Sequence, residues 1–124
     1  MGWEAIRDEF YDRHGDRFVV AWWNGIGKGS GGRQVCSFLT DRVPAYGKPY
    51  ALASAWIDQA KTFDDEASAL AFLRKQDELR PSPLQGWFVT RIADLELKTG
   101  YRSNTKASII GGEVEPEQLA GPRP

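Results

Sequence analysis

The sequence of 124 residues contains a single cysteine, Cys36, and a single histidine, His14. One cysteine cannot form an internal disulfide, and Cys36 lies in an apolar run, so a reducing compartment is the simplest environment. A zinc site needs four ligands, and a Cys–His nucleophilic pair would need a local signature that neither residue has. We therefore predict that the protein is not an enzyme and holds no metal or other cofactor.

The chain also lacks an excess of charge and a long apolar run. Sixteen Lys and Arg oppose 17 Asp and Glu, so the formal charge of -1 gives no general attraction to nucleic acid or to a membrane. The N-terminus carries acids where an export signal needs basic and then apolar residues, and no segment approaches the length of a membrane span. We expect a cytoplasmic protein.

Large apolar side chains are plentiful. Hydrophobic residues make up 41% of the chain and include five Trp, which suffices for one compact core. We expect a single α+β domain over 1–110 and a flexible Gly/Pro/acidic tail over 111–124, because the tail is too polar and proline-rich to pack by itself.

Apolar residues at helical spacing predict an N-terminal helix over 3–13 and a packed central helix over 64–79. Asp64 is the expected N-cap of the central helix, and His14 is placed to cap the last carbonyls of the first one.

Between and after these helices we expect a small, mainly antiparallel sheet of roughly three to four strands. Runs of β-branched and aromatic residues predict its strands over 18–23, 33–39 and 87–92, with a weaker strand over 50–58. Beyond residue 93, Leu95 and Leu97 alternate only weakly, and 107–110 could form a short edge strand.

A glycine-rich segment joins the first two strands. Residues 24–32 include five glycines and contain the string Gly-x-Gly-x-x-Gly. A phosphate site built on that string needs a helix after it, whereas 33–39 reads as a strand. We therefore interpret the segment as a mobile hairpin loop.

Adjacent tryptophans in the first strand give the best argument for a protein partner. Successive side chains of a strand point to opposite faces, so one of Trp22 and Trp23 faces the helices. The other is either exposed or covered by a second layer, and an exposed Trp is a typical binding anchor. We predict a protein-binding module that acts stoichiometrically, on another protein or on a copy of itself, through Trp22, Trp23, Tyr46 and Tyr50.

Basic residues interleave with the same rings and leave nucleic-acid binding as an alternative. Cations contact phosphates and flat rings stack on unpaired bases. The candidate residues of this hairpin, 17–50, are Lys28, Arg33, Arg42 and Lys48, together with Arg17, and Lys98, Arg102 and Lys106 could extend the patch. The simpler reading is that the Trp rings are core and the charges are scattered in solvent.

Separate pieces of the chain resemble known kinds of protein. Trp23 to Gly27, Gly32 to Gln34 and Phe63 to Ala67 resemble parts of a WGR domain, a nucleic-acid-associated module found beside polymerases of ADP-ribose. That resemblance favours the nucleic-acid alternative. The order of strand, Trp-containing segment and alanine-rich helix also resembles orphan proteins of phages and mobile elements, which commonly act as inhibitors that occupy a host protein surface.

Overall fold

The computed structural model describes residues 2–26, 34–43, 49–80, 86–100 and 102–107. In chain order the elements are α1 (Trp3–His14), β1 (Phe18–Ile26), β2 (Gln34–Leu39), β3 (Ala53–Ser54), the 3-10 helix η2 (Ile57–Gln59), α2 (Glu66–Leu79), β4 (Trp87–Arg91) and α3 (Ile92–Thr99). The strands form one antiparallel sheet in the order β3-β2-β1-β4. The predicted α+β class is confirmed, with an N-terminal helix and a central helix on the sheet. No helix among these described ranges is long and apolar enough to cross a bilayer.

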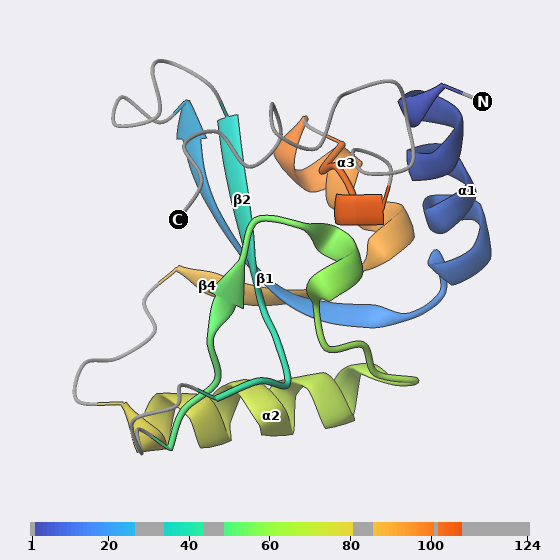
Figure 1. The fold of residues 1–124 in the computed structure, drawn as a ribbon. Coiled ribbons are helices and arrows are strands. Elements are labelled where there is room, and N and C mark those ends of the chain that lie inside the picture. Colours follow the sequence, from blue (N-terminus) through green and yellow to red (C-terminus); the bar gives the residue numbers. More distant parts are fainter. Residues whose placement is uncertain (1, 27–33, 44–48, 81–85, 101, 108–124) are drawn as a thin grey trace.

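Helices cover both faces of the sheet. Figure 1 shows α2 along one face, with α1 and α3 on the opposite side. The period-two alternation of the strands divides their side chains between these layers. Val20 of β1 and Leu39 of β2 belong to a buried cluster with Phe63 and with Ala69 of α2. This cluster fixes α2 against the sheet.

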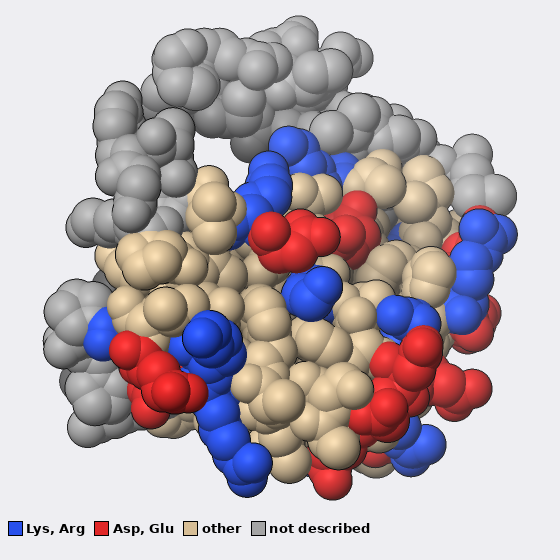
Figure 2. Space-filling model, turned by 90° about the horizontal axis from the view of Figure 1, so that it is seen from below, with Lys and Arg blue, Asp and Glu red and all other residues tan. Residues whose placement is uncertain are grey.

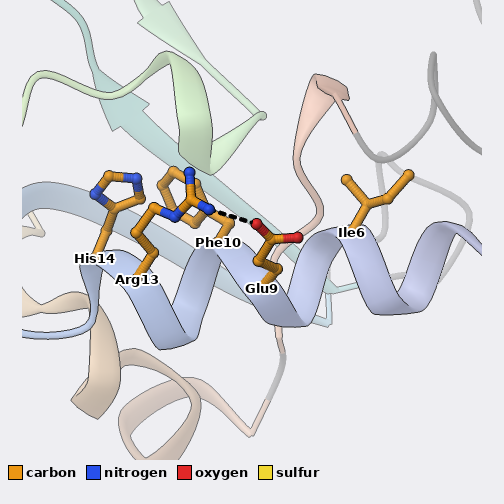
Figure 3. A pocket seen from close by; sticks show the side chains of 5 residues that line it. All are labelled: Ile6, Glu9, Phe10, Arg13 and His14. Carbon is orange, nitrogen blue, oxygen red and sulfur yellow. Dashed lines mark hydrogen bonds and ion pairs between the residues drawn. The ribbon is translucent and has the colours of Figure 1, made fainter. Parts of the chain in front are cut away.

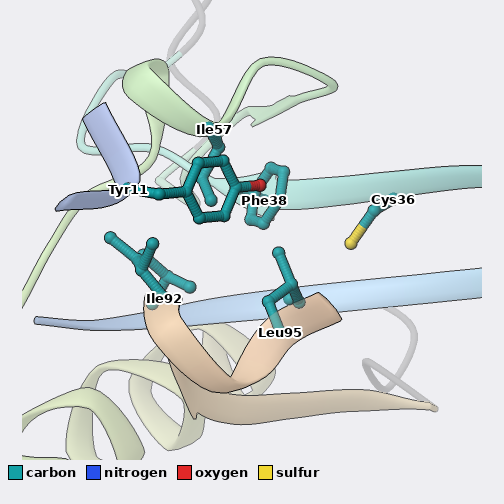
Figure 4. Packing of buried hydrophobic residues seen from close by; sticks show 8 residues of the cluster. Tyr11, Cys36, Phe38, Ile57, Ile92 and Leu95 are labelled. Atoms are coloured by element: carbon teal, nitrogen blue, oxygen red, sulfur yellow. The ribbon is translucent and has the colours of Figure 1, made fainter. Parts of the chain in front are cut away.

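The larger core cluster lies on the α1/α3 side. Val19, Ala21, Cys36 and Phe38 of the strands meet residues of both helices and of η2 there. Figure 4 shows this packing from close by, with Cys36 and Phe38 labelled. The contributions from outside the sheet are Tyr11, Ile57, Ile92 and Leu95. Burial of these side chains is the main force that holds the N-terminal and C-terminal parts of the chain together.

A short C-terminal segment, 102–107, fastens α1 to η2. The Tyr11 hydroxyl donates a buried hydrogen bond of 2.9 Å to the Ser103 carbonyl. The N–H of Ile57 donates to the Asn104 carbonyl, and the Asp58 carboxylate accepts from the N–H groups of residues 106 and 107. Of the edge strand predicted over 107–110, residue 107 lies in a helical turn instead, and 108–110 fall outside the described residues.

The central helix begins one residue later than predicted. Asp65, not Asp64, is its N-cap, because the Asp65 carboxylate accepts a 2.7 Å hydrogen bond from the N–H of Ser68. Asp64 instead forms an ion pair of 2.5 Å with Arg17. Both carboxylates were plausible caps, and only the geometry of the preceding turn separates them.

One further strand is much shorter than predicted, and one helix was not predicted. The strand predicted over 50–58 is a strand only at Ala53–Ser54, because Ile57 turns into the core at the start of η2. The weak alternation after residue 93 is the helix α3, whose buried residues Ile92, Leu95 and Thr99 recur at helical spacing. Leu97 suggested a strand period because it is apolar, yet its side chain is 87% exposed.

Candidate functional site

Trp22 lies beside a second tryptophan that the sequence analysis did not single out. The antiparallel pairing of β1 with β4 places Trp22 opposite Trp87, and their ring centroids are 6.4 Å apart with planes tilted by 31°. Trp87 packs against the α2-side cluster. Both indoles are half-buried, so each keeps part of its surface in contact with solvent. Two adjacent rings of this kind make a broad amphipathic surface.

Gly86 brings the backbone close to the same rings. It adopts a left-handed conformation with φ of 82°, and a Cβ atom there would lie 3.0 Å from Nε1 of Trp22. Glycine is required for both reasons, because a side chain would strain the backbone and press on the indole. The turn into β4 is therefore shaped around Trp22.

Trp23 lies on the opposite face, as the alternation predicted. Its ring packs against the cluster on the α1/α3 side, and its Nε1 is buried without a hydrogen-bond partner among the described residues. Since helices cover both faces, the second layer that the sequence left open is present. Trp23 is thus part of the core packing, and Trp22 is the better candidate for an external contact.

The two predicted tyrosines are placed differently. Tyr46 lies outside the described residues. Tyr50 is half-buried near the end of α2, where the guanidinium of Arg80 lies 4.5 Å from its ring centroid. Arg80 also donates to the Ala51 carbonyl, and the Gln76 amide oxygen accepts from the Ala51 N–H. These bonds hold the Tyr50 backbone against α2.

Most of the basic residues predicted to bind nucleic acid do not gather into one patch in the part of the chain that the structure describes. Lys28, Arg33 and Lys48 lie outside the described residues, and Arg42 is exposed after the end of β2. Arg17 is paired with Asp64. Figure 2 shows that basic and acidic side chains alternate on the α2 side of the molecule, with uncharged surface between them.

Two of the three residues proposed to extend that patch, Arg102 and Lys98, contact other side chains of the chain. Arg102 forms ion pairs with Asp8 at 2.8 Å and with Glu96 at 3.0 Å. The Lys98 ammonium lies 5.8 Å from the Phe88 ring centroid, and Lys106 is exposed. An arginine neutralised by two carboxylates contributes little attraction for phosphate.

His14 lines a shallow hollow on α1, shown in Figure 3 with Ile6, Glu9, Phe10 and Arg13. The His14 imidazole packs on the Phe10 ring with centroids 4.8 Å apart, and Arg13 is paired with Glu9 at 2.6 Å. The hollow is lined by one helix and has a charged rim that is already neutralised.

Cys36 lies in the core on the α1/α3 side, where burial raises the pKa of its thiol to about 11. The thiol is therefore protonated at neutral pH and is a poor nucleophile. Within the part of the chain that the structure describes, no group of three or more His, Cys, Asp or Glu side chains is arranged to hold a metal ion.

Comparisons of the chain with protein families, with curated proteins and with solved structures gave no match. The function is therefore inferred from the residues of the chain itself. Among the described side chains, the paired indoles of Trp22 and Trp87 at the start of β4 form the surface best suited to binding.

Proposed function

We propose that the protein is a non-catalytic protein-binding module that acts stoichiometrically, with the Trp22–Trp87 pair as its anchor. The observation that supports this proposal is the pair itself: two half-buried indoles 6.4 Å apart beside an outer strand of the sheet. Tryptophan is among the residues that contribute most to protein interfaces, because one ring buries a large apolar area and keeps a polar N–H.

Of the two adjacent tryptophans, Trp22 and Trp23, we assign Trp22 as the binding anchor. Trp23 is half-buried like Trp22, but its ring packs against the core cluster and its Nε1 is buried, so its loss should act on folding. Trp22 instead contacts Trp87 and the backbone at Gly86. Removing Trp22 should therefore act mainly on binding.

The test compares three immobilised baits in affinity capture from the native host: the wild type, Trp22→Ala and Trp23→Ala. Truncation of an interface anchor typically costs about 2 kcal/mol or more, so Trp22→Ala should reduce recovery of the specific partner about thirtyfold or more. Its melting temperature should change little.

Trp23→Ala is the matched control, because it removes the same side chain from the same strand. The half-buried Trp23 ring packs against the core cluster, so its loss should lower stability by up to about 3 to 5 kcal/mol, the cost of deleting a fully buried large aromatic residue. If the Trp22→Ala bait is folded and recovers the same proteins in the same amounts as the wild type, Trp22 is not a binding anchor and the proposal is wrong.

A further inference from the structure

Among the described residues, the strand β4 is paired along one edge and open along the other. The sheet order β3-β2-β1-β4 places β4 on the outside, and its only strand partner among the described residues is β1. The five residues Trp87–Arg91 are therefore flanked by another strand on one side alone. An outer strand of this kind offers backbone N–H and C=O groups to a further strand.

The hydrogen bonds of β1 identify which residues of β4 direct their backbone N–H and C=O groups away from β1. Phe18 exchanges both of its backbone bonds with Phe63, on the β2 side, whereas the Arg17 carbonyl accepts from Ile92, on the β4 side. Because backbone groups alternate along a strand, the residues after Phe18 that bond to β4 are Val19 and Ala21.

The pairing partners of Val19 and Ala21 are Thr90 and Phe88. Their backbone groups therefore face β1. The N–H and C=O of Val89, between them, must point away from β1, and no described residue forms a hydrogen bond with them. Val89 is the centre of the open edge.

The open edge is self-complementary. If two copies of β4 pair antiparallel about a two-fold axis at Val89, all five residues overlap, and Val89 opposes Val89 of the second copy. The outward N–H and C=O groups of Val89 then form two hydrogen bonds across the axis. Registers shifted by two residues leave part of the strand unpaired.

The same register places the aromatic Trp87 of one copy opposite the cationic Arg91 of the other. Trp87, Val89 and Arg91 share that face by alternation, and Trp87 and Val89 pack against the α2-side cluster. In the symmetric pair, Trp87 opposes Arg91 of the second copy at both ends, where the Arg91 guanidinium forms an ion pair of 3.1 Å with Asp94 of its own chain. A guanidinium paired in this way can still lie over a ring, as Arg102 does: it pairs with Asp8 and lies 4.7 Å from the Tyr11 ring centroid. A guanidinium over an indole is a favourable cation–π contact. The formal charge of -1 gives little repulsion between copies.

We propose that the partner of this module is a second copy of the same chain, bound by antiparallel pairing of the two β4 edges. The two sheets then form one continuous sheet across the two-fold axis. This inference rests on the proposed function, because Trp87 of the proposed anchor pair lies on the edge strand, while Trp22 lies one strand further in, on β1.

The decisive variant is Val89→Cys. Directly opposed residues of a hydrogen-bonded antiparallel pair have Cα atoms about 5.5 Å apart, which lies within the range of a disulfide. Under mild oxidation, Val89→Cys should form a covalent dimer in high yield. Leu97→Cys is the matched control: Leu97 is 87% exposed on α3, and a cysteine there should cross-link only slowly, through random collision of two copies. The natural Cys36 is 2% exposed and should not interfere.

Two measurements on uncross-linked protein complete the test. Sedimentation of the wild type should give twice the monomer mass, and Val89→Pro should give a monomer. Proline at 89 removes an outward N–H and leaves the bonds of β4 to β1 in place. Val89→Ala, which keeps the N–H, should still form the dimer and controls for loss of the side chain.

A monomeric wild type into the high micromolar range, with Val89→Cys cross-linking no faster than Leu97→Cys, would overturn the self-pairing. The two proposals fail separately. If the wild type is monomeric but Trp22→Ala loses a different captured protein, the binding function stands with another partner. If the dimer forms and Trp22→Ala captures as well as the wild type, the edge pairing stands and the anchor is wrong.

Discussion

Replacing Tyr11 by phenylalanine removes one hydroxyl group and leaves the aromatic ring in place. The ring belongs to the core cluster on the α1/α3 side, and the guanidinium of Arg102 lies 4.7 Å from its centroid. Both contacts persist in the variant. What is lost is the 2.9 Å hydrogen bond to the Ser103 carbonyl. Burial raises the pKa of the Tyr11 phenol, so in the wild type the hydroxyl is protonated and donates throughout the neutral range.

The expected cost follows from burial at both ends of that bond. Tyr11 is 7% exposed and Ser103 is 1% exposed, so solvent cannot readily replace the lost donor. A buried acceptor left without its partner typically costs about 1 to 3 kcal/mol. We expect the free energy of unfolding to fall by that amount, which for a domain of this size lowers the melting temperature by roughly 3 to 6 °C per kcal/mol.

Urea denaturation measures the change, and hydrogen exchange localises it. The midpoint should fall with little change in slope, and the amides of Lys106 and Ala107, which donate to Asp58, should exchange faster because the segment 102–107 loses an attachment. Ser103→Ala is the matched control. It keeps the Ser103 carbonyl that accepts from Tyr11 and removes only the neighbouring hydroxyl, whose partner, the Cys36 thiol, bonds weakly, so it should cost less than Tyr11→Phe. Equal stability of Tyr11→Phe and the wild type, with unchanged exchange, would refute the reasoning.

The remaining predictions concern the turn at Gly86 and the response to acid. Gly86→Ala and Gly100→Ala both introduce a side chain at positive φ, so both should destabilise the fold by about 1 to 2 kcal/mol. Only Gly86→Ala should shift the indole N–H resonance of Trp22, because a Cβ at Gly100 meets nothing within 4 Å. An unmoved resonance in Gly86→Ala would contradict the close approach. The Arg102 guanidinium holds the pKa of Asp8 below its ordinary value, so the stabilisation is present above about pH 4 to 5 and is lost as pH falls through the lowered pKa. The urea midpoint of the wild type should therefore decline below about pH 5 more steeply than that of Asp8→Asn, and parallel declines would show that the pair contributes nothing.

Local sequence patterns predicted most of the fold but not its third helix, α3. The strands β1, β2 and β4 and the helices α1 and α2 follow from runs and periods that a short window contains. The helix α3 does not, because its apolar residues include the exposed Leu97, which mimics a strand period. The choice between Asp64 and Asp65 as the N-cap depends on one turn of backbone, and both residues satisfy the composition rule.

The candidate site shows the same division between local and long-range information. The opposite faces of Trp22 and Trp23 follow from alternation alone. The neighbour of Trp22 does not, because Trp87 lies far along the chain and meets it only through the register of β1 with β4. A register is fixed by the core and by turns, and a single strand sequence does not contain it.

A sheet covered by helices on both faces directs any strand-mediated binding to its edges. At one edge, β3 is two residues long and leads directly toward η2, so it offers little backbone to a partner. At the other edge, β4 offers five residues, and the backbone N–H and C=O groups of Val89 point away from β1 at its centre. Short or charged edge strands normally resist association, and the charged residue on β4 is Arg91, whose guanidinium is paired with Asp94 of α3. In the symmetric pair this ion pair lies opposite Trp87 of the second copy. Replacing Arg91 would therefore remove both the charged side chain at the edge and its contact with the second copy.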